Sequence, residues 1–359
     1  MSIRRWVTTV AAAALLIALA APAIAIAETT PTPEPTATPD ATVTVIAVGD
    51  LMVHRGQLSA AYSHGVYDFA PSFRAIAPWI KAADIAAGNL ETTLRSSGFT
   101  GYPCFRSPTA YARALKGAGF DVLTTANNHT LDGGATGVRY TASYLDRLGL
   151  AHTGSNKSGM TVVTHDGVKI AFIAFTYGTN GIRSPFAGAV NRIDMITMKH
   201  WIAHGRAQAD LVIVVPHFGA EYSRTPESAT KAKARAWIDA GADLVLGSHP
   251  HVVRPVEKYR GHYIVYSMGN FISTMTKPYT DLGIMVSATV TRRSGVAKVA
   301  RLKVLPVYRD VSYGQGTSTW RTVLISDALK AGASRISASD RAHMRAYRSY
   351  CARVFRGYL

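Results

Sequence analysis

Polar side chains able to bind metal gather where the apolar runs of this sequence end. They follow five of the first six such runs, at Gly49-Asp50, Asn89-Leu90-Glu91, Asn127-Asn128-His129, His217 and Gly247-Ser248-His249-Pro250-His251. In an open α/β sheet, ligands bind outside the carboxyl ends of the strands. We therefore expect these loops to converge on one crevice, although they span about two hundred residues of sequence. A single His or Asn at a strand end would be an ordinary cap or loop residue, but the whole set is hard to explain in that way.

The donor types favour a divalent transition metal. Two carboxylates, an amide oxygen and three or four imidazoles suit one or two ions of Mn, Zn or Fe, whereas Ca would bind fewer imidazoles. His249 and His251 are two residues apart after a strand, so an extended segment stiffened by Pro250 would place both rings on one face. Asn128 and His129 are adjacent and should point apart. This arrangement suits one metal ligand and one residue that acts on the substrate.

Short β-branched apolar runs alternate with longer amphipathic segments from Thr42 onward, which is typical of an α/β fold. The predicted strands are Val43–Val48, Ile85–Ala87, Val122–Thr125, Ile170–Phe175, Leu211–Val215, Leu244–Leu246, Tyr263–Tyr266, Ile284–Thr289 and Ala300–Val307. The predicted helices are Pro71–Ala82, Thr109–Ala118, Gly137–Leu148, Ile193–Ala207, Glu227–Ala240 and Ser339–Phe355. After Gly247 strands follow one another directly, so we expect this later part to be antiparallel. With no internal repeat, and no linker inside the folded body, one compact domain is expected.

The N-terminus has the pattern of an export signal. Arg4 and Arg5 precede an apolar run that ends in small residues, and the stretch Val7–Ala27 is also long enough to be an uncleaved membrane anchor. A Pro/Thr-rich tract then predicts an extended linker. We expect an extracytoplasmic protein, secreted or membrane-anchored at the cell surface. The expected boundaries are 1–27 for the signal peptide or anchor, 28–41 for the linker, 42–310 for the folded domain and 311–359 for a C-terminal helical extension.

The exported part is strongly basic. The chain has 359 residues, 48% of them apolar and 17% charged, which excludes a disordered protein. Of its 39 Lys and Arg, two lie in the leader, so 37 remain against 22 acidic residues. Such a charge favours an anionic envelope polymer or a phosphorylated substrate as partner. No nucleic acid is expected, because the sequence has no clustered basic and aromatic motif. Whether Cys104 and Cys351, the only cysteines, form a disulfide is left open.

Six ordered motifs resemble the CapA family, which is named for poly-γ-glutamate capsules and is similar to calcineurin-like metallophosphoesterases. The motifs are Gly49-Asp50-Leu51-Met52 with Arg55, Asn89-Leu90-Glu91, Ala126-Asn127-Asn128-His129 with Leu131-Asp132, His217-Phe218-Gly219-Ala220-Glu221-Tyr222, Gly247-Ser248-His249-Pro250-His251, and Tyr266-Ser267-Met268-Gly269-Asn270-Phe271. The resemblance covers Val43 to Val307. It implies a four-layer α/β/β/α sandwich with a dinuclear-type metal site at the sheet edge.

The resemblance also implies roles for single residues. By position, the implied metal ligands are Asp50, Glu91, Asn128, His217, His249 and His251, with His129 as the general acid. Phosphoesterases of this kind usually carry Asp-x-His on the first strand, but here Met52 stands where the imidazole would be. His54 could approach that position, or the site could hold one ion, or the fold could have kept its ligands without hydrolysis.

Three further residues are predicted to act on the substrate. Arg55 follows the first motif and could hold a carboxylate or phosphate oxygen and supply charge in catalysis. Glu221 and Tyr222 follow His217 and could contact the substrate.

The expected function is to assist synthesis, export or anchoring of an anionic polymer of the poly-γ-glutamate type, with a membrane synthase complex as a further partner. A secreted metal-dependent phosphoesterase acting on envelope phosphates is the alternative, and a non-catalytic protein that binds an acidic polymer is the third. Because poly-γ-glutamate contains no phosphate, the resemblance does not decide whether the chain is an enzyme.

Overall fold

Two β-sheets pack against each other through a shared apolar core. The computed structural model describes residues 40–314, 317–330 and 336–359. The predicted leader and all but the last two residues of the predicted linker therefore lie outside the described residues. From Asp40 onward the described residues belong to one compact unit.

Within the described part of the chain, the larger sheet has eight strands. Their order is β18 (Thr317–Leu324), β17 (Val296–Gly314), β16 (Leu282–Arg293), β1 (Ala41–Leu51), β4 (Ile85–Leu90), β7 (Val122–Thr124) and β8 (Ala151–Thr153), with β15 (Asn270–Ile272) beside β1. β1, β4, β7 and β8 are parallel to one another, whereas β16, β17 and β18 form an antiparallel extension beside β1. The register places Asp50 opposite both Asn89 and Asn270, so the polar carboxyl end of β1 lies beside those of its neighbours.

The smaller sheet has six strands among the described residues. Their order is β13 (Val253–Tyr259), β14 (His262–Met268), β12 (Leu244–Leu246), β11 (Leu211–His217), β10 (Val168–Thr176) and β9 (Thr161–His165). The four central strands are parallel, and β13 and β9 pair antiparallel at the two edges. β10 and β11 are apolar and buried along almost their whole length, as expected for central strands that are covered on both faces.

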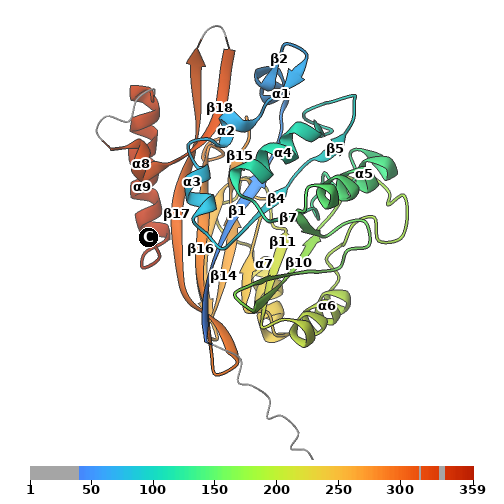
Figure 1. Cartoon of the computed structure of the whole chain (residues 1–359). Helices are drawn as coiled ribbons and strands as arrows, with labels where there is room; N and C mark the ends of the chain where they lie inside the picture. Colours follow the sequence, from blue (N-terminus) through green and yellow to red (C-terminus); the bar gives the residue numbers. More distant parts are fainter. Residues whose placement is uncertain (1–39, 315–316, 331–335) are drawn as a thin grey trace, which may run out of the picture. The chain divides into compact units, whose positions relative to one another are not determined.

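Helices cover the outer face of each sheet, which confirms the predicted four-layer α/β/β/α sandwich (Figure 1). The helices are α1 (Arg55–Ala61), α2 (Ala70–Phe73), α3 (Ala77–Lys81), α4 (Thr109–Ala118) and α5 (Gly134–Arg147) on the larger sheet, and α6 (Met195–Gln208) and α7 (Ser228–Asp239) on the smaller one. Neighbouring side chains of β1 face opposite layers: Val45 joins the core between the sheets, and Ile46 packs under the helices.

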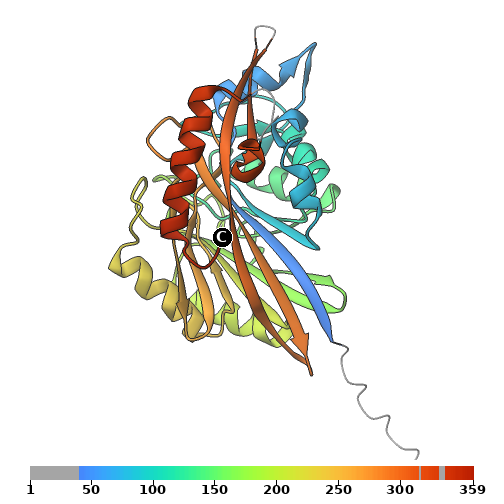
Figure 2. The ribbon, with the colours of Figure 1, turned by 90° about the vertical axis from the view of Figure 1, so that its left-hand side faces the viewer.

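The C-terminal region closes the core between the sheets. α8 (Ile325–Ala328) and α9 (Ala338–Val354) follow β18, and Figure 2 shows α9 lying along β17. Met344, Cys351 and Phe355 are fully buried in the core between the sheets. Residues 311–359 are therefore not the purely helical extension that was predicted, because they include β18, which pairs with β17. Cys104 and Cys351 are both free, so they form no disulfide.

Local sequence signals explain where helices begin and end. α4 has the predicted bounds and ends at Gly119, whose φ of 107° is the left-handed cap that glycine adopts most easily. The single predicted helix Pro71–Ala82 is instead the pair α2 and α3, each with a proline in its first turn, Pro71 and Pro78. Proline lacks a backbone N–H, so it is tolerated in a first turn but breaks the interior of a longer helix.

Two small strand pairs outside the main sheets complete the fold. They are β2 (Tyr62–Ser63) with β3 (Val66–Tyr67), and β5 (Thr93–Arg95) with β6 (Arg106–Pro108). Across the described ranges, no helix combines the length and the apolarity that crossing a membrane requires.

Candidate metal centre

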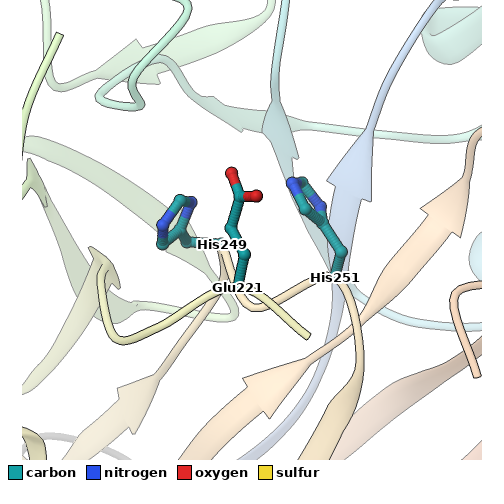
Figure 3. A group of neighbouring side chains, drawn as sticks. All are labelled: Glu221, His249 and His251. Atoms are coloured by element: carbon teal, nitrogen blue, oxygen red, sulfur yellow. The ribbon is translucent and has the colours of Figure 1, made fainter. Parts of the chain in front are cut away.

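The carboxyl ends of strands from both sheets meet, and they bring two groups of candidate metal ligands together. Ligand atoms of Asp50, Glu91 and His217 lie within 4.8 Å of one another, and all three residues are buried. A second group, Glu221, His249 and His251, meets the same distance limit. Figure 3 shows the Glu221 carboxylate between the rings of the two histidines. We call these the strand-end group and the loop group.

In the strand-end group, Glu91 is the residue that most clearly lacks a partner. Its carboxylate is fully buried, and neither oxygen has a hydrogen-bond partner. Burial, followed by the charge of Asp50, raises the pKa of Glu91 well above its usual value. Burial likewise lowers the pKa of His217 well below its usual value, which favours the neutral imidazole. Buried carboxylate oxygens without donors beside a neutral imidazole fit a divalent cation.

Buried amides hold the strand-end group in place. Asn89 donates from Nδ2 to Asp50 Oδ1 at 2.8 Å, and Asn127 donates to Asn89 Oδ1 at 3.2 Å. His217 Nε2 lies 2.8 Å from Asn128 Oδ1, and His217 Nδ1 lies 3.1 Å from Ser248 Oγ. Second partners of this kind orient metal-binding side chains in proteins. Asn89 had no predicted role, although it stands in a quoted motif.

The loop group is built on strained backbone. His249 and His251 have φ values of 99° and 58°, so the predicted extended segment is wrong. Left-handed conformations cost non-glycine residues about 1–2 kcal/mol each and gather at functional sites. His249 Nδ1 has no hydrogen-bond partner, and burial, followed by the charge of His251, lowers the pKa of His249 to about 3. Burial alone would lower the pKa of His251, but the hydrogen bond and charge of Asp50 raise it.

The loop that carries Glu221 is held by an ion pair between a buried arginine and a half-buried glutamate, which the sequence did not indicate. Arg254 of β13 is fully buried and donates to Glu227 Oε1 at 2.8 Å. It also donates to the backbone oxygens of Ala220 and Ser223, which flank Glu221. Burial alone would raise the pKa of Glu227, but the hydrogen bonds from Arg254 lower it to about 2.

His129 has a buried carboxylate behind it. Its Nδ1 lies 2.7 Å from Asp132 Oδ2, and Asp132 also accepts from the backbone nitrogen of Phe105 at 2.6 Å. Because Asp132 engages Nδ1, Nε2 is the ring nitrogen left for a substrate. The i,i+3 spacing of the two residues, together with their place in one motif, was the signal that could have indicated Asp132.

A cleft of about 720 Å³ opens beside the loop group. Its lining includes Met52, His54, Tyr102, Cys104, Phe105, Asn128, His129, Asp132, Glu221, Tyr222, His251 and Lys277. Burial lowers the pKa of His54 to about 4, and its Nδ1 accepts a hydrogen bond from the backbone nitrogen of Thr274 at 3.3 Å. His54 therefore forms part of the cleft wall but belongs to neither group of candidate ligands.

Arg55 does not reach this cleft, contrary to the prediction. It is exposed and borders a separate surface depression with Tyr62, Tyr67 and Phe99. The reason is the phase of α1, which buries Gln57 and Leu58 and turns its first residue outward.

Comparisons with known proteins agree with the predicted resemblance. The family described as "Bacterial capsule synthesis protein PGA_cap" matches residues 44–275. The capsule biosynthesis protein CapA of Bacillus anthracis is 30% identical over 247 residues, which cover 64% of this chain and 59% of that protein. The PGA biosynthesis protein CapA of Bacillus subtilis is also 30% identical over 247 residues, covering 65% of this chain and 64% of that protein. The match thus spans less than two thirds of either relative.

Among solved structures, the calcineurin-like phosphoesterase YfkN from Bacillus subtilis is similar with 14% identity and a TM-score of 0.45, covering 88% of this chain and 99% of that chain. Because the family match extends over well more than half of its residues, this chain belongs to the bacterial capsule synthesis family PGA_cap.

Proposed function

We propose that this protein works outside the cytoplasm, where it assists synthesis, export or anchoring of an anionic envelope polymer of the poly-γ-glutamate type through a metal-dependent site. The observation that carries the proposal is the buried Glu91 carboxylate, which has no hydrogen-bond donor and lies beside Asp50 and His217. Family membership supports the link to capsule polymers. The basic composition supports an anionic partner.

The two groups would hold one ion each, with Mn, Zn or Fe as the metal. Asp50, Glu91 and His217 would bind the first, and Glu221, His249 and His251 the second, with the Asn128 amide beside His217. A bound metal would lower the pKa of a water molecule and stabilise negative charge on a reacting oxygen. The orphaned atoms of Glu91 and His249 support this assignment, since a cation would satisfy both.

The chain's own residues would handle the proton and the substrate. His129, oriented by Asp132, would hold a proton at Nε2 and deliver it to a leaving oxygen or nitrogen. Tyr222 lines the cleft beside His251, at a ring distance of 6.1 Å, and would contact the substrate.

The place of action is also part of the proposal. Residues 1–27 would carry the chain across the membrane or anchor it there, and the Pro/Thr-rich tract would act as a stalk. A membrane synthase complex would then be the natural partner at the surface.

The test is complementation of a strain that lacks the gene. Wild type should restore the amount of surface polymer, and His217→Ala should not, because removing one buried ligand costs most of the metal affinity. Elemental analysis of the purified full chain should show metal in the wild type and a loss in this variant. His200→Ala changes an exposed histidine of α6 and is the matched control. Normal surface polymer in the strain carrying His217→Ala would reject the proposal.

A second function, hydrolysis of envelope phosphates, is favoured by the pair of His129 and Asp132 beside the candidate ligands. It predicts chelator-sensitive hydrolysis of p-nitrophenyl phosphate or its bis ester by the purified protein, lost in His129→Ala. Metal-loaded protein that leaves both esters intact would reject this second function. Binding of an acidic polymer without turnover would then identify a non-catalytic role.

A further inference from the structure

Two short segments at the edge of the cleft each contribute one cation and one aromatic ring. The Lys277 ammonium lies 3.6 Å from the ring centre of Tyr222. Two residues further along each segment the roles are exchanged: the first segment now supplies the cation, Arg224, and the second supplies the ring, Tyr279. The Arg224 guanidinium lies 4.1 Å from the ring centre of Tyr279. Tyr350 of α9 contacts the same guanidinium at 5.2 Å. We call Lys277 and Arg224 the cationic rim.

The cationic rim adjoins the loop group. Tyr222 and Lys277 both line the cleft, and the ring of Tyr222 lies 6.1 Å from that of His251. Among the described residues that line the cleft, Lys277 is the only Lys or Arg. With Arg55 outside the cleft, Lys277 is therefore the cation placed to meet an anionic substrate.

The backbone under the cationic rim is fixed by hydrogen bonds. Tyr222 N donates to Pro250 O at 2.8 Å, which ties this segment to the loop of His249 and His251. On the other segment, Thr280 donates from its backbone nitrogen and its hydroxyl to Lys277 O, at 3.1 and 2.6 Å. The backbone at Tyr222 and Lys277 is therefore preorganised, and little backbone freedom is lost when a ligand binds.

Neither rim cation is neutralised. Both are exposed, and no described carboxylate lies within ion-pair distance of either. Contact with a tyrosine ring attracts a cation without cancelling its charge. Arg224 can still present its guanidinium edge to a carboxylate. The two cations are therefore held in place yet available to an anion.

We propose that the cationic rim is a subsite for a linear polycarboxylate, with Lys277 in the cleft wall and Arg224 beyond it, and that it binds carboxylates of the polymer that do not reach the candidate metal ligands. Lys277 would bind the carboxylate nearest the loop group, and Arg224 one further along the polymer. The identity of the ligand rests on the proposed function, but the subsite itself rests on the geometry of the two cations. A polymer with regularly repeated carboxylates fits two cations placed in succession, one in the wall of the cleft and one beyond it.

The experiment measures binding of poly-γ-glutamate of defined length to the purified full chain at low salt, with the metal removed by a chelator. The double variant Lys277→Gln with Arg224→Gln should bind roughly three- to tenfold more weakly, as expected for the loss of two exposed charge contacts. Its binding should also depend less on salt. Lys277→Arg, which keeps the charge, should bind like the wild type.

Arg147→Gln is the matched control, because Arg147 is also exposed and lies 5.1 Å from a tyrosine ring, that of Tyr144 on α5. Its affinity should not change. The proposal that the cationic rim binds the polymer would be overturned by an unchanged affinity of the double variant, or by an equal loss of affinity in the Arg147 variant. Equal competition by polyphosphate of the same total charge would overturn the carboxylate assignment. The proposed function is tested separately, by complementation with His217→Ala. Normal surface polymer in that strain would reject the proposed function but would not change the result of the binding experiment.

Discussion

The strand-end group and the loop group adjoin, with His251 Nδ1 3.2 Å from Asp50 Oδ2, but they are positioned by different means. Asp50, Glu91 and His217 lie at or just beyond the ends of β1, β4 and β11, and all are buried. In the loop group Glu221 is exposed, and His249 and His251 stand in left-handed backbone. The strand-end group therefore inherits its geometry from the sheets, whereas the loop group depends on contacts such as the Arg254–Glu227 pair.

This difference suggests a division of tasks. A buried group held by sheet registers and amides is preorganised and should bind metal tightly. A group on loops with one exposed ligand, Glu221, can adjust to a substrate and should bind metal more weakly. The loop group has one carboxylate, Glu221, so its metal affinity should depend strongly on that residue.

The largest expected effect comes from Glu91→Gln, which removes the charge with little change of volume. Without metal, the variant should unfold at the same or a higher temperature than the wild type, because its side chain cannot ionise in the core. Metal at about a hundred times its dissociation constant should stabilise only the wild type, by about 2.7 kcal/mol. Calorimetric scans with and without metal measure both effects. An equal metal-induced shift in the variant would contradict the assignment of the strand-end group.

A smaller effect is expected from Glu227→Gln, which breaks the ion pair under the loop group. Leaving the buried Arg254 without its anion should cost about 2 kcal/mol of stability at pH 7. The folded pKa of Glu227 is about 2 against an ordinary 4.5, so its contribution is present above pH 4.5 and is lost as the pH falls toward 2. Urea unfolding of both proteins at several pH values should therefore show a difference that shrinks on acidification. A constant difference would show that the ionised pair is not responsible.

The smallest effect is expected from Glu221→Gln. Metal affinity of the loop group should fall about tenfold, while the strand-end group keeps its ion. A calorimetric titration with metal would measure the affinities of the loop group and the strand-end group separately. Arg55→Gln is the control, because Arg55 is exposed and outside the cleft and should change neither affinity nor stability. Loss of both ions with Glu221→Gln would mean that the two groups do not bind independently.

The main strands could be predicted because their signal is local. A buried parallel strand such as β12, Leu244–Leu246, reads as a short apolar run between turn residues, and its predicted bounds agree with the structure. Strands such as β13 and β18 were missed, because they carry many polar residues and pair only at a sheet edge. Their pairing depends on partners far along the chain, which no local pattern reveals.

The sequence alone determined which donor types stand at the strand ends, since apolar runs of this length must become strands and polar residues must follow them. Tertiary structure decided which of those side chains face the cleft. It turned Arg55 outward, placed the Glu221 carboxylate beside His249 and His251, and put Asp132 behind His129. The physical reason is that helix phase and loop path are set by packing and by distant hydrogen bonds, as between Arg254 and the loop of Glu221.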